Sequence, residues 1–258
     1  MPEVSGKAKE RRQLAYEAVT PAQWNQRFQG LEALEQFQLG VVAQMTARRP
    51  DDPPRVVLEV GCGTGRMVAL YPGERYVGMD RASHFVQFCQ SHRSTDDSQF
   101  LLADMDHLPF SKGAFDLILL MGTLESETNV LERVDALIFY LRSGGQLFFT
   151  LQNRRNLFGR VGNAFSRSYK QTFWGHRQLV ELLARRYYHP KMVSVFVVPP
   201  GVMRLLTRST AWLPGLRRFI VGAFLALEWV NLRYQLKLGY EWQILLRRPV
   251  HPRPTTNR

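Results

Sequence analysis

The segment "VVLEVGCGTGRM", residues 56–67, decides the fold. An apolar run with one acid, Glu59, leads into three glycines and then a predicted helix. The glycines are Gly61, Gly63 and Gly65. Because glycine has no Cβ, this spacing lets a bound molecule approach the backbone closely. It differs from the Gly-x-Gly-x-x-Gly of dinucleotide folds and from the P-loop, which ends in Gly-Lys-Ser/Thr. The segment therefore predicts a ligand-binding turn at the carboxyl end of a strand.

Strand and helix patterns alternate along the rest of the chain. Apolar runs typical of strands lie at 55–60, 75–79, 99–103, 115–121, 146–152, 192–198 and 240–248. Amphipathic helix patterns lie at 20–48, 83–91, 129–141 and 174–188. The alternation predicts an α/β fold, a seven-stranded, mostly parallel, doubly wound sheet with helices on both faces. Gly144 and Gly145 predict a turn before the fifth strand, and a helical insertion with a break at Pro214-Gly215 precedes the last one.

Two acidic residues follow the next two predicted strands. Asp80 stands 19 residues after Gly61, where a carboxylate can accept two hydrogen bonds from a ribose diol. Asp104 follows the third strand, where its carboxylate can reach an adenine amino group while Met105 packs on the ring. The alternatives are a helix N-cap for Asp80 and a turn residue for Asp104.

The motifs taken together resemble one family. They are "VLEVGCGTG", Asp80, "ADMDHLPF", "FDLILLMGTLE" and "LRSGGQLFFT". With them, residues 55–152 resemble the Class I S-adenosylmethionine-dependent methyltransferases, and the last strands match more weakly. The resemblance implies the fold of that family and S-adenosylmethionine as the cofactor.

The resemblance also implies which residues touch the cofactor. They are Glu59, Gly61, Cys62, Gly63, Gly65, Asp80, Arg81, Asp104, Met105, Met121 and Gly122. In that family the glycines line the methionine part, Asp80 holds the ribose, and Met121 with Gly122 lies beneath the sulfonium. Glu59 supports the loop and faces the amino group. Cys62 is expected to be a packed side chain rather than a nucleophile, because no Lys or His adjoins it.

The chain is expected to divide into five parts. They are an N-terminal helical segment or lid (1–54), the S-adenosylmethionine-binding core (55–152), the remainder of the sheet domain (153–198 and 240–248), an amphipathic helical insertion (199–239) and a disordered tail (249–258). Two cysteines fit a reducing compartment, and the start has no secretory pattern. The longest apolar run, 219–227, is far shorter than the roughly 20 residues of a membrane span. A cytoplasmic protein, peripheral on the membrane, is expected.

Positive charge is concentrated in the second half of the chain. Residues 1–141 hold 14 Lys/Arg and 19 Asp/Glu, a net charge of −5, whereas residues 142–258 hold 20 and 3, a net charge of +17. The insertion mixes arginines with bulky apolar side chains, which is typical of binding at an anionic bilayer surface. A solvated basic surface and helices that pack on the domain or form a dimer interface are the alternatives.

The chemistry needs mainly proximity and orientation, because a sulfonium is a good leaving group. The candidate general bases are Glu125 and Glu127, just past the fourth strand, and His176, at the start of a later helix; Glu125 is the best placed. The alternatives are a solvated acid for Glu125 and a capping histidine for His176. Tyr16 is a weaker candidate and belongs to an N-terminal lid. No cysteine–histidine cluster predicts a metal site.

The acceptor is predicted from the second half of the chain. The sequence "MGTLES" after the fourth strand lacks the Asn/Asp-Pro-Pro-Tyr motif of base N-methylation. The preferred interpretation is a lipid-linked, polyprenyl or quinone-type acceptor at a membrane surface. An RNA methyltransferase would also explain the positive charge, and a non-catalytic, cofactor-binding partner of a membrane assembly would explain the lack of an unmistakable base. The acceptor atom and the oligomeric state stay open.

Overall fold

The fold is that of a computed structural model of the chain. It describes residues 14, 16–26, 29, 31–124, 127, 129–153, 173–186, 188–196, 200–210 and 212–249. The predicted tail lies outside these residues except for Pro249. All structural statements below refer to the described ranges.

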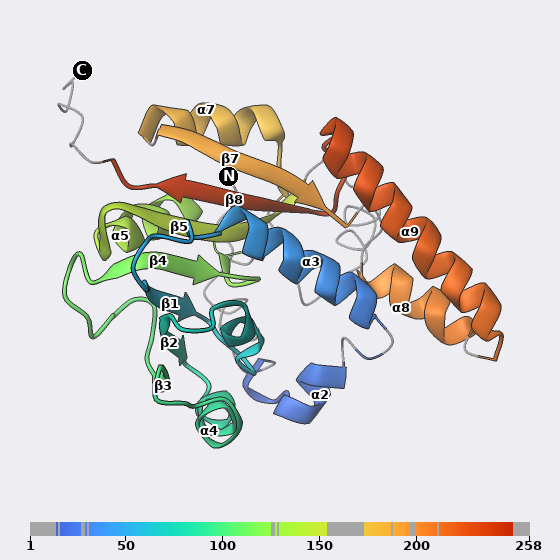
Figure 1. Cartoon of the computed structure of the whole chain (residues 1–258), viewed down its shortest axis with the longest axis horizontal. Coiled ribbons are helices and arrows are strands. Elements are labelled where there is room, and N and C mark those ends of the chain that lie inside the picture. Colours follow the sequence, from blue (N-terminus) through green and yellow to red (C-terminus); the bar gives the residue numbers. More distant parts are fainter. Residues whose placement is uncertain are drawn as a thin grey trace.

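One sheet forms the centre of the molecule (Figure 1). Its strands are β1 (Val56–Val60), β2 (Arg75–Asp80), β3 (Ser98–Leu102), β4 (Phe115–Leu120), β5 (Leu141–Asn153), β7 (Tyr188–Val195) and β8 (Glu241–Arg247). Their order is β3-β2-β1-β4-β5-β8-β7, and only β8 runs antiparallel to its neighbours. A two-residue strand, β6 (Phe173–Trp174), which the sequence did not predict, extends the pairing at the end of β5. The predicted seven-stranded, mostly parallel sheet is confirmed.

Helices cover both faces of the sheet. They are α2 (Pro21–Gln26), α3 (Glu32–Met45), the 3-10 helix η1 (Arg66–Leu70), α4 (Ser83–His92), α5 (Val130–Ile138), α7 (His176–Arg186), α8 (Pro200–Ser209) and α9 (Pro214–Tyr234). Buried side chains of α3, η1 and α4 form one core with the sheet, and apolar residues of α9 pack against it. Those of α5 and α7 form a second core on the opposite face. The helical insertion, α8 and α9, precedes β8 as predicted (Figure 1).

Alternation along the strands separates the two cores. In β4, Leu117 faces the α3 side and Ile118 the α5 side, and both are fully buried. Val57 of β1 lies beside Leu117 in the parallel register and faces the same side. The central strands read as nearly continuous apolar runs because a mostly parallel sheet with helices on both faces buries most of their side chains.

Three local predictions differ from the structure. The helix predicted at 20–48 is two helices, α2 and α3, and a helix-breaking glycine, Gly30, lies in the interval between them. The helix predicted after the glycine turn is only the five-residue η1, because the last glycine has a left-handed conformation and Pro72 soon follows. The predicted Gly144–Gly145 turn lies inside β5, where pairing with β4 shifts register. A Cβ at Gly145 would lie 3.1 Å from the carbonyl oxygen of Asp116, so this bulge needs glycine.

Candidate functional site

The loop after β1 has a conformation that glycine adopts easily and other residues do not. Gly61, Gly63 and Gly65 have φ angles of +76°, +52° and +67°. A Cβ at Gly61 would lie 2.6 Å from Oγ1 of Thr123, and one at Gly65 would lie 3.0 Å from a sulfur atom in α4. Packing alone therefore requires two of the three glycines. At Gly63 the nearest atom to an added Cβ is Nε1 of Trp24, at 3.5 Å, so this glycine opens toward the N-terminal segment.

Asp80 joins this loop to the end of β2. Its carboxylate is buried, with 2% of the residue exposed. One oxygen accepts hydrogen bonds from the N–H of Gly63 and the O–H of Tyr16, each at 2.9 Å, and the other accepts the N–H of Ala82 at 2.9 Å. The N-cap residue of α4 is Ala82, so Asp80 is not the N-cap. The structure brings Asp80 and the glycine loop together at the carboxyl edge of the sheet.

The N-terminal segment 14–26 packs on the same loop. The Tyr16 ring lies 5.5 Å from that of Trp24 and 5.2 Å from that of Phe85. Burial, followed by the nearby Asp80 charge, raises the pKa of Tyr16 well above its usual range, so its O–H stays a donor. Thr64 of the loop also donates to Oδ1 of Asn25 at 2.8 Å. The sequence suggested Tyr16 only as a lid residue, and nothing in it indicated that Trp24 would reach the loop.

The residues present fit S-adenosylmethionine. A buried carboxylate beside a glycine loop can take both hydroxyls of a ribose, and the bond from Tyr16 shows that this carboxylate is open to an O–H donor. Gly122, which follows β4, has a φ of +69°, and no heavy atom of the described residues lies within 4 Å of an added Cβ, so the described part of the chain leaves space beside it. The N–H of Gly122 donates to Oγ1 of Thr150 at 2.8 Å, which fixes the strand end next to this space.

Glu59 lies inside the sheet rather than at its open edge. The residue is 2% exposed and accepts a hydrogen bond from the O–H of Tyr76 on β2. Burial raises the pKa of Glu59 to about 8, although the hydrogen bond from Tyr76 acts in the opposite direction. A carboxyl that is largely protonated at neutral pH is a poor partner for an ammonium group. Its position fits support of the loop better than contact with the cofactor's amino group.

The other predicted cofactor residues lie around the same edge. Asp104 is exposed beyond β3 and accepts the N–H of Asp106 at 2.9 Å, so it does form a local turn. Met105 is half-buried against the α5-side core, and Arg81 is exposed directly after Asp80. Cys62 is buried, and its hydrogen bond to the neighbouring thiol, followed by burial, raises its pKa well above the usual range. A thiol in that state fits a packed residue.

Of Glu125 and His176, the structure describes only His176. Glu125 lies outside the described residues. His176 begins α7, and its ring lies 5.4 Å from that of Trp242. Trp242 belongs to the α5-side core. Thr150 and Gln243, which pair in the β5–β8 register, face the other side of the sheet. Both residues stay predictions as bases.

A row of buried polar side chains lies on the α3 side of the sheet. In the β5–β8 register Thr150 lies opposite Gln243, and Gln152 lies opposite Glu241. Glu241 accepts a hydrogen bond from Gln38 of α3 at 3.0 Å. The side-chain oxygen of Gln152 and both polar atoms of the Gln243 amide are buried without a hydrogen-bond partner among the described residues. No local sequence pattern predicts this row, because strand pairing alone assembles it.

Unpaired amides in a core are costly. Each buried donor or acceptor without a partner costs about 1–3 kcal/mol. These amides lie next to Thr150, which binds the backbone at the end of β4 beside the open space at Gly122. A ligand with a polar group that entered from this edge would satisfy them.

Comparison with known proteins supports the same family. Residues 58–149 match the family model of a methyltransferase domain. The malonyl-acyl-carrier-protein O-methyltransferase of Legionella pneumophila is 29% identical over 113 residues, 38% of this chain and 40% of that protein. The fatty-acid O-methyltransferase of Mycolicibacterium smegmatis is 30% identical over 113 residues, 41% of this chain and 40% of that protein. This chain thus spans about two fifths of the length of these curated relatives.

Solved structures agree at the level of the fold. An S-adenosylmethionine-dependent methyltransferase of Thermotoga maritima superposes with a TM-score of 0.58 at 14% identity, over 88% of this chain and 94% of that one. The domain match covers β1 to β5, which carry the glycine loop and Asp80. Residues 58–149 thus match a methyltransferase domain, and the fold of the chain is that of the Class I S-adenosylmethionine-dependent methyltransferases.

Proposed function

We propose that the protein transfers a methyl group from S-adenosylmethionine to a lipid-linked, polyprenyl or quinone-type acceptor at an anionic membrane surface. The observation that carries this proposal is the insertion, which packs on the sheet with one side and exposes large apolar side chains on the other. The names of two relatives support a lipid-type acceptor. One is a malonyl-acyl-carrier-protein O-methyltransferase and the other a fatty-acid O-methyltransferase.

The exposed side of the insertion is unusually apolar. Trp212 is 77% exposed, Phe219 73% and Trp229 61%. On α9, Leu216, Phe219, Leu227 and Tyr234 follow one another at helical spacing, and all are exposed. Apolar patches of this kind mark surfaces that bind a partner or a membrane. We call this exposed side of α8 and α9, with Trp212 between them, the apolar face.

Charge favours an anionic lipid surface as the partner of the apolar face. Arg218 and Arg233 of α9 are exposed beside it, and no acidic side chain is exposed on α9. A basic residue near an anionic surface contributes about 1 kcal/mol. No helix in the described part of the chain is long and apolar enough to cross a membrane, so contact would be at the surface.

The inner side of α9 lies over the sheet beside the polar row. Asn231 donates to the carbonyl oxygen of Ser194 in β7 at 2.6 Å, and its Oδ1 accepts the N–H of Leu238. Phe224 and Leu232 pack against the α3-side core. One helix thus borders the proposed acceptor position and presents the apolar face. An acceptor with a long apolar chain could keep its chain in the bilayer while its polar end reaches the sheet edge.

The division of chemical roles follows from these positions. The cofactor, when bound, supplies a methyl group on a good leaving group. The residues of the chain hold the acceptor close to that methyl group and in the orientation for transfer. The amides of Gln152 and Gln243 offer both donors and acceptors, which suits a hydroxyl or enol group. A carboxylate would be repelled by Glu241 beside them. The general base stays open between Glu125 and His176.

Replacing the amides of Gln152 and Gln243 should affect stability and turnover differently. Changing Gln152 and Gln243 together to leucine removes unpaired buried groups, so we expect the melting temperature to stay level or rise. Turnover of the lipid acceptor should fall at least about tenfold, because the acceptor loses its hydrogen bonds. Thermal melting and label transfer to lipid, measured on the same preparation, check both. A lower melting temperature with unchanged turnover would show that the amides are structural.

The proposed function is tested by incubating the protein with radiolabelled S-adenosylmethionine and a total lipid extract, with total RNA in parallel. Label in the organic phase is the expected result. Label in RNA alone would support the RNA methyltransferase that the positive charge also allows. Tight cofactor binding without transfer to either extract would support the non-catalytic partner of a membrane assembly.

A further inference from the structure

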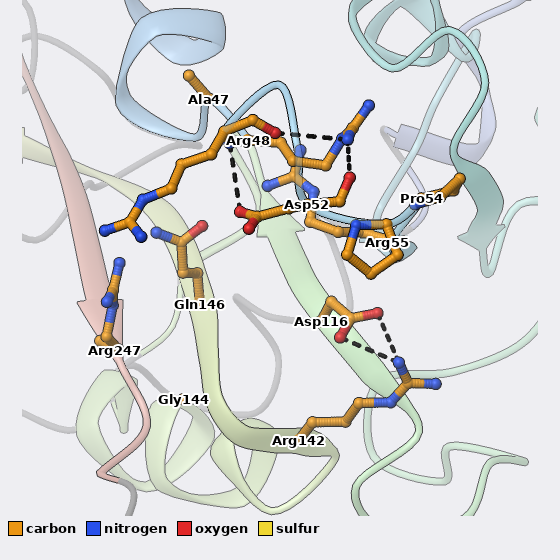
Figure 2. Close-up of a pocket in the computed structure, with 12 residues that line it drawn as sticks. Ala47, Arg48, Asp52, Pro54, Arg55, Asp116, Arg142, Gly144, Gln146 and Arg247 are labelled. Carbon is orange, nitrogen blue, oxygen red and sulfur yellow. Dashed lines mark hydrogen bonds and ion pairs between the residues drawn. The ribbon is translucent and has the colours of Figure 1, made fainter.

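A second cleft lies at the opposite edge of the sheet from the glycine loop. It has a volume of about 430 Å³ and is lined by the segment before β1, the start of β4, the first part of β5 and the end of β8 (Figure 2). The glycine loop follows the carboxyl end of β1, whereas residues 47–55 precede its amino end. The cleft is therefore separate from the proposed methyl-transfer site.

Arginine dominates the lining of this cleft. Its charged residues are Arg48, Arg49, Arg55, Arg142 and Arg247 against Asp52 and Asp116. With Glu74, which pairs with two of these arginines, five cations and three anions leave an excess of two positive charges at a concave surface. Such a surface focuses the electrostatic field and attracts anions.

Three of the arginines have partners that hold the wall in place. Arg55 pairs with the buried Glu74 at 3.0 Å and also donates to the carbonyl oxygen of Thr46 at 2.7 Å. Arg48 lies 3.5 Å from Glu74. On the other side Arg142 pairs with Asp116 at 2.9 Å, as the dashed lines of Figure 2 show.

The remaining two arginines are not neutralised. Among the described residues, no carboxylate lies within ion-pair distance of Arg49 or Arg247. Arg247 is exposed and lies directly opposite Gln146 in the β5–β8 register. Figure 2 shows the two side chains on the same side of the cleft. The amide of Gln146, which can donate hydrogen bonds, thus lines the same cleft as the guanidinium groups of Arg49 and Arg247. Ion pairs with Glu74 and Asp116 hold the surrounding wall in place.

We propose that this cleft binds a phosphate-bearing anion, a phosphate monoester or a diphosphate, through Arg49, Arg247 and Gln146. Guanidinium groups match phosphate oxygens in pairs and stay charged at every physiological pH. The apolar members of the lining are only Ala47, Pro53 and Pro54 beside its charged and polar side chains, so the phosphate carries the recognition. The phosphate can belong to a soluble molecule or to a lipid head group, which the test distinguishes.

The test is titration calorimetry of the full chain at low salt with inorganic pyrophosphate and with glucose 6-phosphate, and vesicle flotation with phosphatidic acid. The double variant Arg49→Gln/Arg247→Gln is expected to weaken binding at least about tenfold, which is about 1.4 kcal/mol. The matched control is Arg177→Gln/Lys191→Gln, which removes two exposed charges elsewhere and should bind like the wild type.

The outcomes distinguish a soluble phosphate, a lipid head group and general electrostatic attraction to a basic protein. Heat with the soluble phosphates indicates a soluble ligand. Flotation with phosphatidic acid alone, lost in the cleft variant and kept in the control, indicates a lipid head group. Absence of binding to all three probes, or equal weakening in both double variants, would overturn the proposal, because general attraction to a basic protein would then explain the result. Melting curves of both variants confirm that each is folded.

Discussion

Replacing Asp80 by alanine should nearly abolish binding of S-adenosylmethionine. The carboxylate is 2% exposed and accepts hydrogen bonds from the loop and from Tyr16. Losing two hydrogen bonds to a charged group costs about 3 kcal/mol, which corresponds to a Kd at least about 100-fold higher. Titration calorimetry with S-adenosylmethionine and with its demethylated product measures the change.

Tyr16→Phe is the matched control for Asp80→Ala. It removes the O–H that now occupies the Asp80 carboxylate but keeps the ring against Trp24. We expect this variant to bind the cofactor as tightly as the wild type or more tightly. If Asp80→Ala melts normally and binds the cofactor unchanged, the ribose site lies elsewhere and the assignment of this edge is wrong.

Changing Trp212 and Phe219 together to serine should release the protein from anionic vesicles. Each side chain is more than two-thirds exposed, so its replacement disturbs little of the fold. Inserting a large apolar side chain contributes about 1.5 kcal/mol, so losing two should lower the partition coefficient about 100-fold. Co-sedimentation with vesicles of phosphatidylglycerol and phosphatidylcholine measures it, and binding of the wild type should weaken when the anionic lipid is omitted.

Leu102 and Phe139 provide a matched control for the apolar face. They are 59% and 55% exposed and lie on β3 and at the end of α5, away from α8 and α9. Their double change to serine should leave vesicle binding as it is. Equal loss in both double variants would point to general hydrophobic adsorption and would contradict a membrane role for the apolar face. Persistent binding in the Trp212/Phe219 variant would also contradict it.

Local sequence patterns predicted the parts of the fold that local physics determines. The glycines after β1 and the acid that ends β2 are adjacent to strong apolar runs, so both could be placed on strand ends. The break at Pro214 was visible because proline suits the first turn of a helix, where α9 indeed begins. Strand limits were less predictable. Gly145 predicted a turn, but in the structure it permits a bulge within β5. The bulge depends on the pairing of β5 with β4, which the local sequence does not show.

Contacts between distant residues could not be predicted in the same way. The hydrogen bond between Tyr16 and Asp80 joins residues 64 apart, and the sequence of neither one indicates the other. Gln152 and Gln243 looked like polar interruptions of two apolar strands. Only the antiparallel register of β5 and β8 brings them to one buried face, where the side-chain oxygen of Gln152 and both polar atoms of the Gln243 amide have no hydrogen-bond partner among the described residues. The role of Glu125 stays a prediction.

The bond from Tyr16 to Asp80 places the N-terminal segment on the same carboxylate that is predicted to hold the ribose. A cofactor that needs this carboxylate must first displace the phenol, so its apparent affinity is lowered by the fraction of molecules in which the N-terminal segment is closed. The same bond can re-form as the spent nucleoside departs, and would then oppose its return. We therefore predict that the described N-terminal segment, residues 16–26, competes with the cofactor for Asp80 rather than only covering the site.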